Sequence, residues 1–146
     1  MWNTYCKKVT ILDRDELIKE LNRVLAEYNQ KLPVYIHPKC FEELMQLLQA
    51  SGSEKAFIRK LLEFLSIIYS NPTTFAFSSG LENIKGEPGI YSMRFKLREK
   101  NIRILFSIQE NSLLALTAFH ERSGKKISSY SSYFPIAHMR LKDMIR

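Results

Sequence analysis

The sequence predicts an α+β fold in which helices pack on one side of a small antiparallel sheet. Apolar residues recur with the helical period of about 3.6 residues up to residue 70, and the period changes to about 2 residues after residue 90. Short polar turns separate the apolar segments of the second part, which favours an antiparallel meander. The chain has 146 residues, a length that suits one hydrophobic core.

The first expected element is an amphipathic helix over residues 13–30. Its apolar residues share one face: Leu17, Ile18, Leu21, Val24, Leu25 and Tyr28. Asp13 or Asp15 is available as the N-cap. Pro33 follows the helix, and the β-rich run of residues 34–37 before Pro38 predicts a first, short strand.

Two further helices are expected over residues 39–49 and 54–69. Each carries an apolar stripe at helical spacing, and the Ser-Gly-Ser-Glu segment of residues 51–54 supplies both a stop and a new cap. Consecutive helices joined by such a short turn predict an α-hairpin. Asn71 and Pro72 end it.

Three strands are expected between residues 90 and 120. In the first, apolar and polar residues alternate: Tyr91, Met93, Phe95 and Leu97 with Ser92, Arg94, Lys96 and Arg98. A second alternating run covers residues 102–109. Residues 113–120 are almost continuously apolar, which predicts a strand covered on both faces. A polar segment then leads to a final amphipathic stretch, residues 134–145.

Composition narrows the class of protein. Hydrophobic residues make up 45% of the chain and charged residues 25%, so a disordered or fibrous protein is not indicated. No apolar run is long enough for a membrane span and the first residues lack the order of a secretory signal, so we expect a cytoplasmic protein without a membrane partner. Cys6 and Cys40 are expected to be reduced thiols, and no metal site or cofactor is expected. Nucleotide-loop, metalloprotease and serine-hydrolase motifs are absent from the sequence.

The positive charge is concentrated in one part of the chain. The net charge is +7; residues 1–84 hold 10 basic and 10 acidic residues, and residues 85–146 hold 12 and 5. A polyanion is the natural partner of such a segment. A charge excess that only keeps the protein soluble is the alternative interpretation.

Arg94, Lys96 and Arg98 form a cationic face on the first strand of the meander. Alternate residues of a strand are roughly 6.5 to 7 Å apart, a spacing that approximates that of successive phosphates along a nucleic-acid strand. Arg103 lies on the next strand just past the hairpin, and a same-face placement makes it a fourth cation. An ordinary solvated strand face is the competing interpretation.

His120 ends the last strand of the meander. The following segment contains more charged and aromatic residues: Glu121, Arg122, Lys125, Lys126, Tyr130 and Tyr133. A cationic sheet face bordered by a histidine and aromatic rings predicts an RNA-handling surface. A single histidine at a strand end is also commonly structural.

Four sequence segments carry a resemblance to a known family. They read LENIKGEPGIYSMRFK (residues 81–96), IRILF (102–106), LTAFHERSGKK (116–126) and IAHMRLK (136–142). Together they resemble the RelE/ParE superfamily of type II toxins, in particular its phage-associated, HigB-like branch. The resemblance covers residues 33–146 and implies a RelE-like toxin domain, with residues 1–32 as an N-terminal helical extension.

The resemblance implies a metal-independent, ribosome-dependent mRNA endoribonuclease, or mRNA interferase. Its partners are a cognate antitoxin protein, the ribosome and mRNA. Arg94 and Arg103 are assigned to charge stabilisation in the transition state and His120 to proton transfer. Lys125, Lys126 and Tyr130 are the alternative proton donors, and Glu121 is a further helper. The RNA contacts are assigned to Lys96, Arg98, Arg122, Lys125, Lys126 and Tyr130. The alternatives are a ParE-like toxin that binds DNA gyrase without catalysis, and an inactive relative that only binds a partner.

Overall fold

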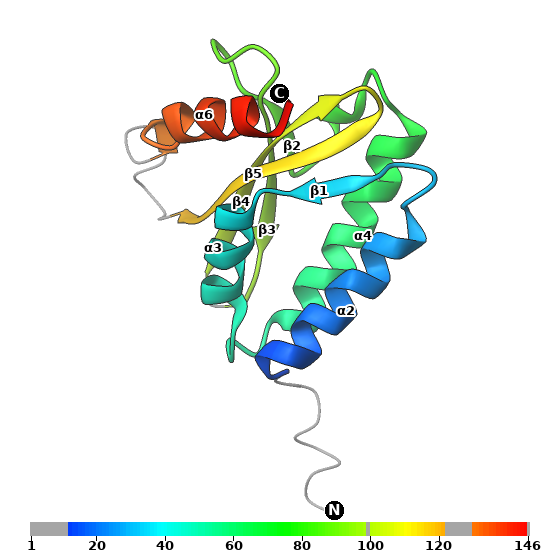
Figure 1. The fold of residues 1–146 in the computed structure, drawn as a ribbon, viewed down its shortest axis with the longest axis vertical. Coiled ribbons are helices and arrows are strands. Elements are labelled where there is room, and N and C mark those ends of the chain that lie inside the picture. The colour runs from blue at the N-terminus through cyan, green and yellow to red at the C-terminus, as the bar shows by residue number, and fades with distance from the viewer. Residues whose placement is uncertain (1–11, 99, 122–129, 146) are drawn as a thin grey trace, which may run out of the picture.

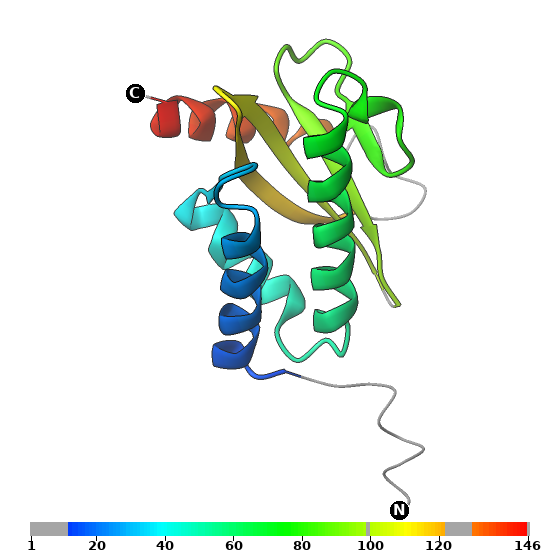
Figure 2. The ribbon, with the colours of Figure 1, turned by 90° about the vertical axis from the view of Figure 1, so that its right-hand side faces the viewer.

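The structure is a computed structural model that describes residues 12–98, 100–121 and 130–145. A five-stranded sheet lies at its centre, with three helices on one face and one helix on the other (Figures 1 and 2). The elements in chain order are α2 (Arg14–Glu27), β1 (Val34–Ile36), α3 (Pro38–Leu48), α4 (Glu54–Ser70), the 3-10 helix η1 (Phe75–Phe77), β2 (Leu81–Asn83), β3 (Tyr91–Lys96), β4 (Asn101–Gln109), β5 (Ser112–Glu121) and α6 (Phe134–Ile145). The expected α+β class is confirmed.

The strands lie in the order β1-β5-β4-β3-β2. Strands β3, β4 and β5 form the expected antiparallel meander, and β1 adds to it in parallel beside β5, with Val34 opposite Leu113. Strand β2 pairs antiparallel with β3 and was not expected, because its three residues are too few to show a hydrophobic period. The sheet is therefore larger and more mixed than the sequence predicts.

The main core lies between the sheet and helices α2, α3 and α4. Met93 and Phe95 of β3 face these helices and are buried, as the alternating pattern predicts. The Phe95 ring contacts the rings of Phe57 and Phe64 on α4, at centroid distances of 4.4 and 5.2 Å. Aromatic pairs of this kind stabilise a core by more than the burial of their apolar area alone. These contacts therefore hold β3 against α4.

Helix α2 belongs to this same core. Asp13 and Glu16 form a capping box at its start, and Leu17, Leu21 and Val24 are buried together with residues of α3, α4 and the sheet. Figures 1 and 2 show α2 beside α4, and α3 packs on β5. The nearest helical neighbour of α4 is therefore α2. The division of the chain at residue 32 stays a prediction, but the hydrophobic cluster extends across that position.

Helix α6 covers the opposite face of the sheet. Ala137 of α6 is buried against a second cluster that includes Ile90, Leu105, Leu116 and Phe119. The expectation that all helices pack on one side is therefore wrong. The apolar character of β5 on both faces is explained by this arrangement, because α3 covers one face and α6 the other.

A β-bulge in β5 changes the phase of its side chains. The pairing with β4 runs regularly from Glu121 to Thr117 and then skips Leu116, so that Phe106 pairs with Ala115. Leu114 and Leu116 therefore share the α6 face with Phe119 rather than with residues 118 and 120.

Three further expectations concern membrane spans, metal sites and thiols. Within the described ranges, no helix has the length and apolar character needed to cross a bilayer. The same ranges hold no group of His, Cys, Asp and Glu side chains placed to bind a metal ion. Cys40 is fully buried, and burial, assisted by the nearby Glu43 carboxylate, raises the pKa of its thiol. Cys6 lies outside the described residues.

Candidate nucleic-acid interface

Arg94 and Arg103 lie directly opposite each other on the neighbouring strands β3 and β4. Cross-strand partners project from the same face of a sheet, so the expected same-face placement of Arg103 is confirmed. This is the face that α6 covers further along the sheet. Two like charges at such a position repel each other unless other groups neutralise them.

Arg103 is buried and its charge is neutralised within the protein. Its Nη2 lies 2.9 Å from the carboxylate of Glu121, whose side chain is equally buried. Its Nη1 donates hydrogen bonds to Ser92 Oγ at 2.8 Å and Glu82 Oε1 at 3.1 Å. The Nε atom has no hydrogen-bond partner among the described residues. Arg103 is thus held by the protein itself, with 6% of its surface exposed.

Tyr130 lies over the Arg103 guanidinium. Arg103 Cζ is 4.4 Å from the centre of the tyrosine ring, and Nη1 also donates a hydrogen bond to the phenol oxygen at 3.2 Å. Behind Tyr130, three more aromatic rings continue the contact, and Phe119 and Tyr133 are stacked at 3.9 Å. This packing fixes the phenol against the cation. Burial raises the pKa of Tyr130 above its ordinary value, although Ser92 and Arg103 act in the opposite direction. The phenol is protonated at neutral pH.

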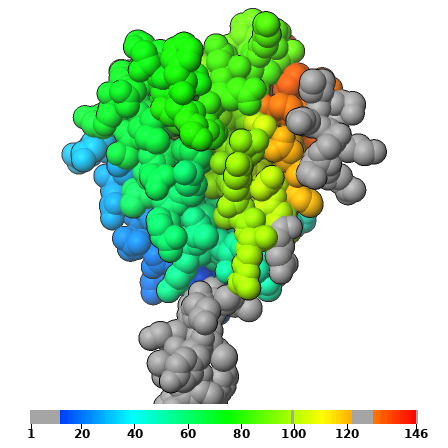
Figure 3. Space-filling view, turned by 180° about the vertical axis from the view of Figure 1, so that it is seen from behind, coloured from blue at the N-terminus to red at the C-terminus, as the bar shows by residue number. Residues whose placement is uncertain are grey.

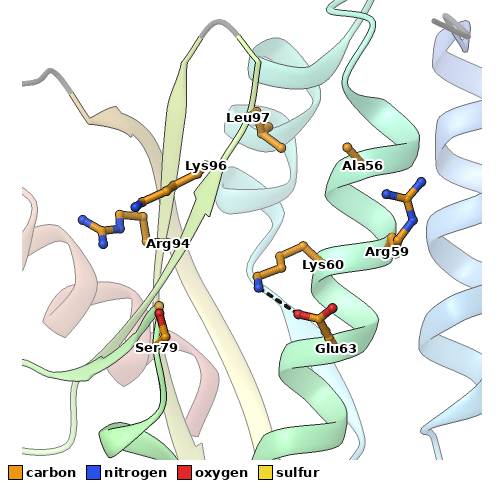
Figure 4. Close-up of a pocket in the computed structure, with 9 residues that line it drawn as sticks. Ala56, Arg59, Lys60, Glu63, Ser79, Arg94, Lys96 and Leu97 are labelled. Carbon is orange, nitrogen blue, oxygen red and sulfur yellow. Dashed lines mark hydrogen bonds and ion pairs between the residues drawn. The ribbon is translucent and has the colours of Figure 1, made fainter. Parts of the chain in front are cut away.

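Arg94, Lys96 and Arg98 are more accessible than Arg103. Lys96 and Arg98 are exposed and Arg94 is half-buried. Figure 4 shows the side chains of Arg94 and Lys96 extending from β3 on the side away from α4. The structure therefore presents the accessible cations of Arg94 and Lys96 on β3 beside one buried, neutralised arginine on β4. Arg98, expected on the same strand, lies two residues beyond the end of β3.

His120 does not join this group. It pairs with Ile102, whose side chain lies in the core on the side of α2, α3 and α4, so the imidazole projects from the other face of the sheet. The bulge at Leu116 is the cause. Simple alternation from Leu114 places residue 120 on the face of Arg103, and the extra residue moves Phe119 and Glu121 there instead.

The sequence did not predict the contacts that three residues make with Arg103. Ser92 alternates with Arg94 on one strand, so the pattern contained its position without its role. Glu121 was expected as a helper of the cleavage in the polar tail, not as the buried partner of Arg103, and Glu82 lies on the unexpected strand β2. Arg122, Lys125 and Lys126, which were expected to contact RNA, lie outside the described residues.

The arrangement can bind a phosphodiester and supply a proton beside it. The guanidinium of Arg94 matches the oxygens of a phosphate, Lys96 continues along the strand, and Arg98 follows just beyond its end. The Tyr130 phenol is fixed by Arg103 and stays protonated, so it can donate a hydrogen bond or a proton.

No protein-family model and no curated protein sequence significantly matches the chain. Among solved structures, the fold is similar to that of a mutant of the E. coli toxin RelE in the free state. The sequence identity is 12%, the match covers 77% of this chain and 96% of that chain, and the TM-score is 0.46.

Proposed function

We propose that the protein is the toxin of a type II toxin-antitoxin system and acts as a metal-independent, ribosome-dependent mRNA endoribonuclease. One observation carries the proposal: accessible cations on β3 lie beside an arginine-bound, protonated phenol. The sequence resemblance to HigB-like toxins supports the reaction class, and the positive charge of residues 85–146 suits a ribosomal partner.

Cleavage without metal requires the ribose 2′-oxygen to attack the adjacent phosphorus. The new bond joins the 2′-oxygen to phosphorus and the bond from phosphorus to the 5′-oxygen breaks. Solvent water takes the proton of the 2′-hydroxyl, and an acid delivers a proton to the leaving 5′-oxygen and regains one from water afterwards. Arg94 stabilises the charge that develops on the phosphoryl oxygens. Tyr130 protonates the leaving oxygen, and Arg103 is a positioning residue that orients the phenol.

This division of roles differs from the one expected from sequence. Arg103 was assigned to direct contact with the phosphate, but it is buried among acceptors. His120 was assigned to proton transfer, but it projects from the opposite face of the sheet. Lys96 and Arg98 keep their proposed contacts with flanking phosphates because both are exposed. The proposed partners are an antitoxin protein, the ribosome and mRNA, and the proposed location is the cytoplasm.

Single-turnover cleavage of mRNA on programmed ribosomes tests the proposal. Arg94→Ala and Tyr130→Phe are each expected to lower the rate at least about a hundredfold, whereas His120→Gln is expected to leave it unchanged. Because the pKa of Tyr130 is raised, the acid stays protonated through neutral pH, and the rate should show no inflection near about pH 6.5, where an imidazole titrates. A hundredfold loss in His120→Gln, with that inflection in the wild type, contradicts the proposed roles.

A ParE-like toxin that binds DNA gyrase without catalysis is the second candidate. The position of His120 favours it, because the sheet face with the arginines lacks an imidazole among its described residues. Inducible expression separates the two. Codon-phased cuts within translated messages support the endoribonuclease, and intact RNA with double-strand DNA breaks supports the gyrase-binding toxin. Intact RNA and DNA together with capture of an antitoxin support an inactive, partner-binding relative.

A further inference from the structure

A fully buried serine lies at the centre of the contacts around Arg103. Ser92 of β3 has no exposed surface, and its Oγ accepts a hydrogen bond from Arg103 Nη1 at 2.8 Å. The same Nη1 also donates to Glu82 at 3.1 Å and to the phenol oxygen of Tyr130 at 3.2 Å. A terminal guanidinium nitrogen carries two hydrogens, so three acceptors share two protons. Arg103 alone therefore does not give the phenol oxygen a full hydrogen bond.

The Ser92 hydroxyl is a second donor to this phenol. Its oxygen accepts from the Arg103 guanidinium, and its hydrogen bonds to the oxygen of Tyr130. Burial raises the pKa of Tyr130, and the bond from Ser92 lowers it more strongly than the charge of Arg103 does, because a donor stabilises the phenolate. The charges of Glu82 and Glu121 raise the pKa in addition. Ser92 is therefore the group that does most to offset the burial of the phenol.

Two bonds to the phenol oxygen fix the direction of its own hydrogen. Arg103 Nη1 and the Ser92 hydroxyl occupy the acceptor positions of Tyr130. The phenol hydrogen is therefore directed away from these buried groups. Figure 3 shows the face of the molecule on which β3, in yellow-green, borders the orange residues at the end of β5 and the start of α6.

We propose that Ser92 is a positioning residue for RNA cleavage, which directs the proton of Tyr130 outward and stabilises the phenolate that remains. In this step the O–H bond of the phenol breaks, the proton bonds to the leaving 5′-oxygen, and the negative charge stays on the phenolate oxygen. A preorganised donor that faces this developing charge lowers the energy of the transition state. The inference rests on the proposed function, in which Tyr130 is the acid. Ser92 itself is buried and does not contact RNA.

Single-turnover cleavage of mRNA on programmed ribosomes tests the inference with Ser92→Ala. The rate should fall at least about tenfold, because a hydrogen bond to a developing charge is lost. In the background of Tyr130→Phe, the same substitution should cost less than about twofold, since the group that Ser92 acts through is already absent. Ser92→Thr keeps the hydroxyl and should restore the rate to within about threefold of the wild type. Additive losses in the double variant overturn the inference.

A message with sulfur in place of the 5′-oxygen, at the bond that the wild type cuts, separates proton transfer from a structural role. A thiol has a pKa of about 8.5, so a thiolate leaves without an acid. Ser92→Ala and Tyr130→Phe should therefore cut this message within about threefold of the wild-type rate. An equal loss in Ser92→Ala on both messages indicates that the serine only supports the fold, and it overturns the inference.

Ser107→Ala is the matched control. Ser107 is likewise fully buried, but it lies on β4 and accepts a hydrogen bond from the side chain of Gln109 at 3.0 Å. Its replacement should leave the cleavage rate within about twofold of the wild type. Similar losses in the two alanine variants contradict a specific role of Ser92, because they show that any buried serine of the sheet has the same effect.

The pKa of Tyr130 tests the hydrogen bond without any cleavage. NMR of a chain labelled with carbon-13 at the oxygen-bearing ring carbon of tyrosine follows this pKa, and Tyr130→Phe identifies the signal. Ser92→Ala should raise the pKa further, because the donor that stabilises the phenolate is lost. An unchanged pKa in a chain that still cuts mRNA overturns the inference and leaves the proposed function standing. A raised pKa in a chain that cuts no message supports the bond from Ser92 to Tyr130 and refutes the proposed function.

Discussion

At the scale of single residues, the two opposed arginines serve different purposes. Arg103 is enclosed by Glu121, Ser92 and Tyr130, and its positive charge is already neutralised. Arg94 has no such enclosure. An arginine that is buried and paired contributes to the stability of the fold, and an accessible one is free to bind an anion. The two opposed arginines therefore have different roles, because one is buried and the other is accessible.

The free energy of unfolding should separate these roles. Arg103→Ala leaves the buried carboxylate of Glu121 without its partner, which costs about 3 to 5 kcal/mol. Arg94→Ala removes an accessible side chain and should change the free energy by less than about 1 kcal/mol. Urea denaturation followed by circular dichroism measures both. Equal, small effects contradict the neutralised role of Arg103.

The sequence predicts the residues of this site better than it predicts their environment. The alternation on β3 and the short hairpin to β4 correctly place Arg94 and Arg103 on one face. The burial of Arg103 depends on Tyr130 and Glu121, which lie elsewhere along the chain and show no local pattern. His120 was placed with them because a bulge of one residue in β5 leaves no recognisable sign in a continuously apolar strand.

At the scale of elements, α6 is fixed on the sheet by an ion pair with α3. Glu43 of α3 accepts two hydrogen bonds from the guanidinium of Arg140, both at 2.9 Å. Glu43 also accepts from the hydroxyl of Thr117 at 3.0 Å and from the backbone N–H of Ala118 at 3.1 Å. Strand β1 ends opposite Ala115, so the carboxylate satisfies backbone of β5 that has no strand partner on that side.

Replacing Glu43 should therefore loosen α6 and the end of β5 together. Glu43→Gln keeps the size of the side chain but removes the charge that Arg140 needs, and we expect a loss of about 2 to 4 kcal/mol in the free energy of unfolding. Glu42→Gln is the matched control. Glu42 is exposed and pairs with Arg14 at the surface, so its loss should cost less than about 1 kcal/mol. Similar denaturation midpoints for the two variants contradict the role of Glu43.

Elements with strong periodicity were predicted closely, and those without it were not. The helix expected over 54–69 is observed as Glu54–Ser70, and the one over 39–49 as Pro38–Leu48. Strand β2 has three residues, of which Leu81 alone is buried. It is a strand because it pairs with β3, and this pairing leaves no hydrophobic period in its own sequence. The final helix was expected, but its position on the opposite face was not, because an amphipathic pattern does not specify which partner covers it.

At the scale of the whole molecule, one hydrophobic core includes the N-terminal helix. Leu17 and Leu21 of α2 have no exposed surface and lie in the cluster that contains Phe57 and Phe95. The resemblance to known toxins covers only residues 33–146, so it assigns α2 to an extension. The packing indicates that the sheet and the other helices depend on α2 for cover.

Two variants test this dependence by cooperative unfolding. Leu21→Ala in the full chain should lower the free energy of unfolding by about 2 to 5 kcal/mol. A chain of residues 33–146 should lose its sharp thermal transition, because the apolar surface that α2 covers becomes exposed. Ala26→Gly, at an exposed position of α2, serves as control and should cost about 1 kcal/mol. A shortened chain that unfolds as sharply as the full protein, at the same midpoint, supports a domain boundary at residue 32.

The parallel pairing of β1 with β5 also constrains the order in which the chain folds. Val34 pairs with Leu113, so this edge of the sheet cannot form until residue 113 has been synthesised. Contacts between distant residues slow folding, and helices α2, α3 and α4 leave the ribosome before the strands that cover their apolar sides. The cations of β3 likewise receive their neighbours on β4 and near Tyr130 late. The face of the sheet that carries Arg94 is therefore expected to be complete only after β5 and Tyr130 have been synthesised.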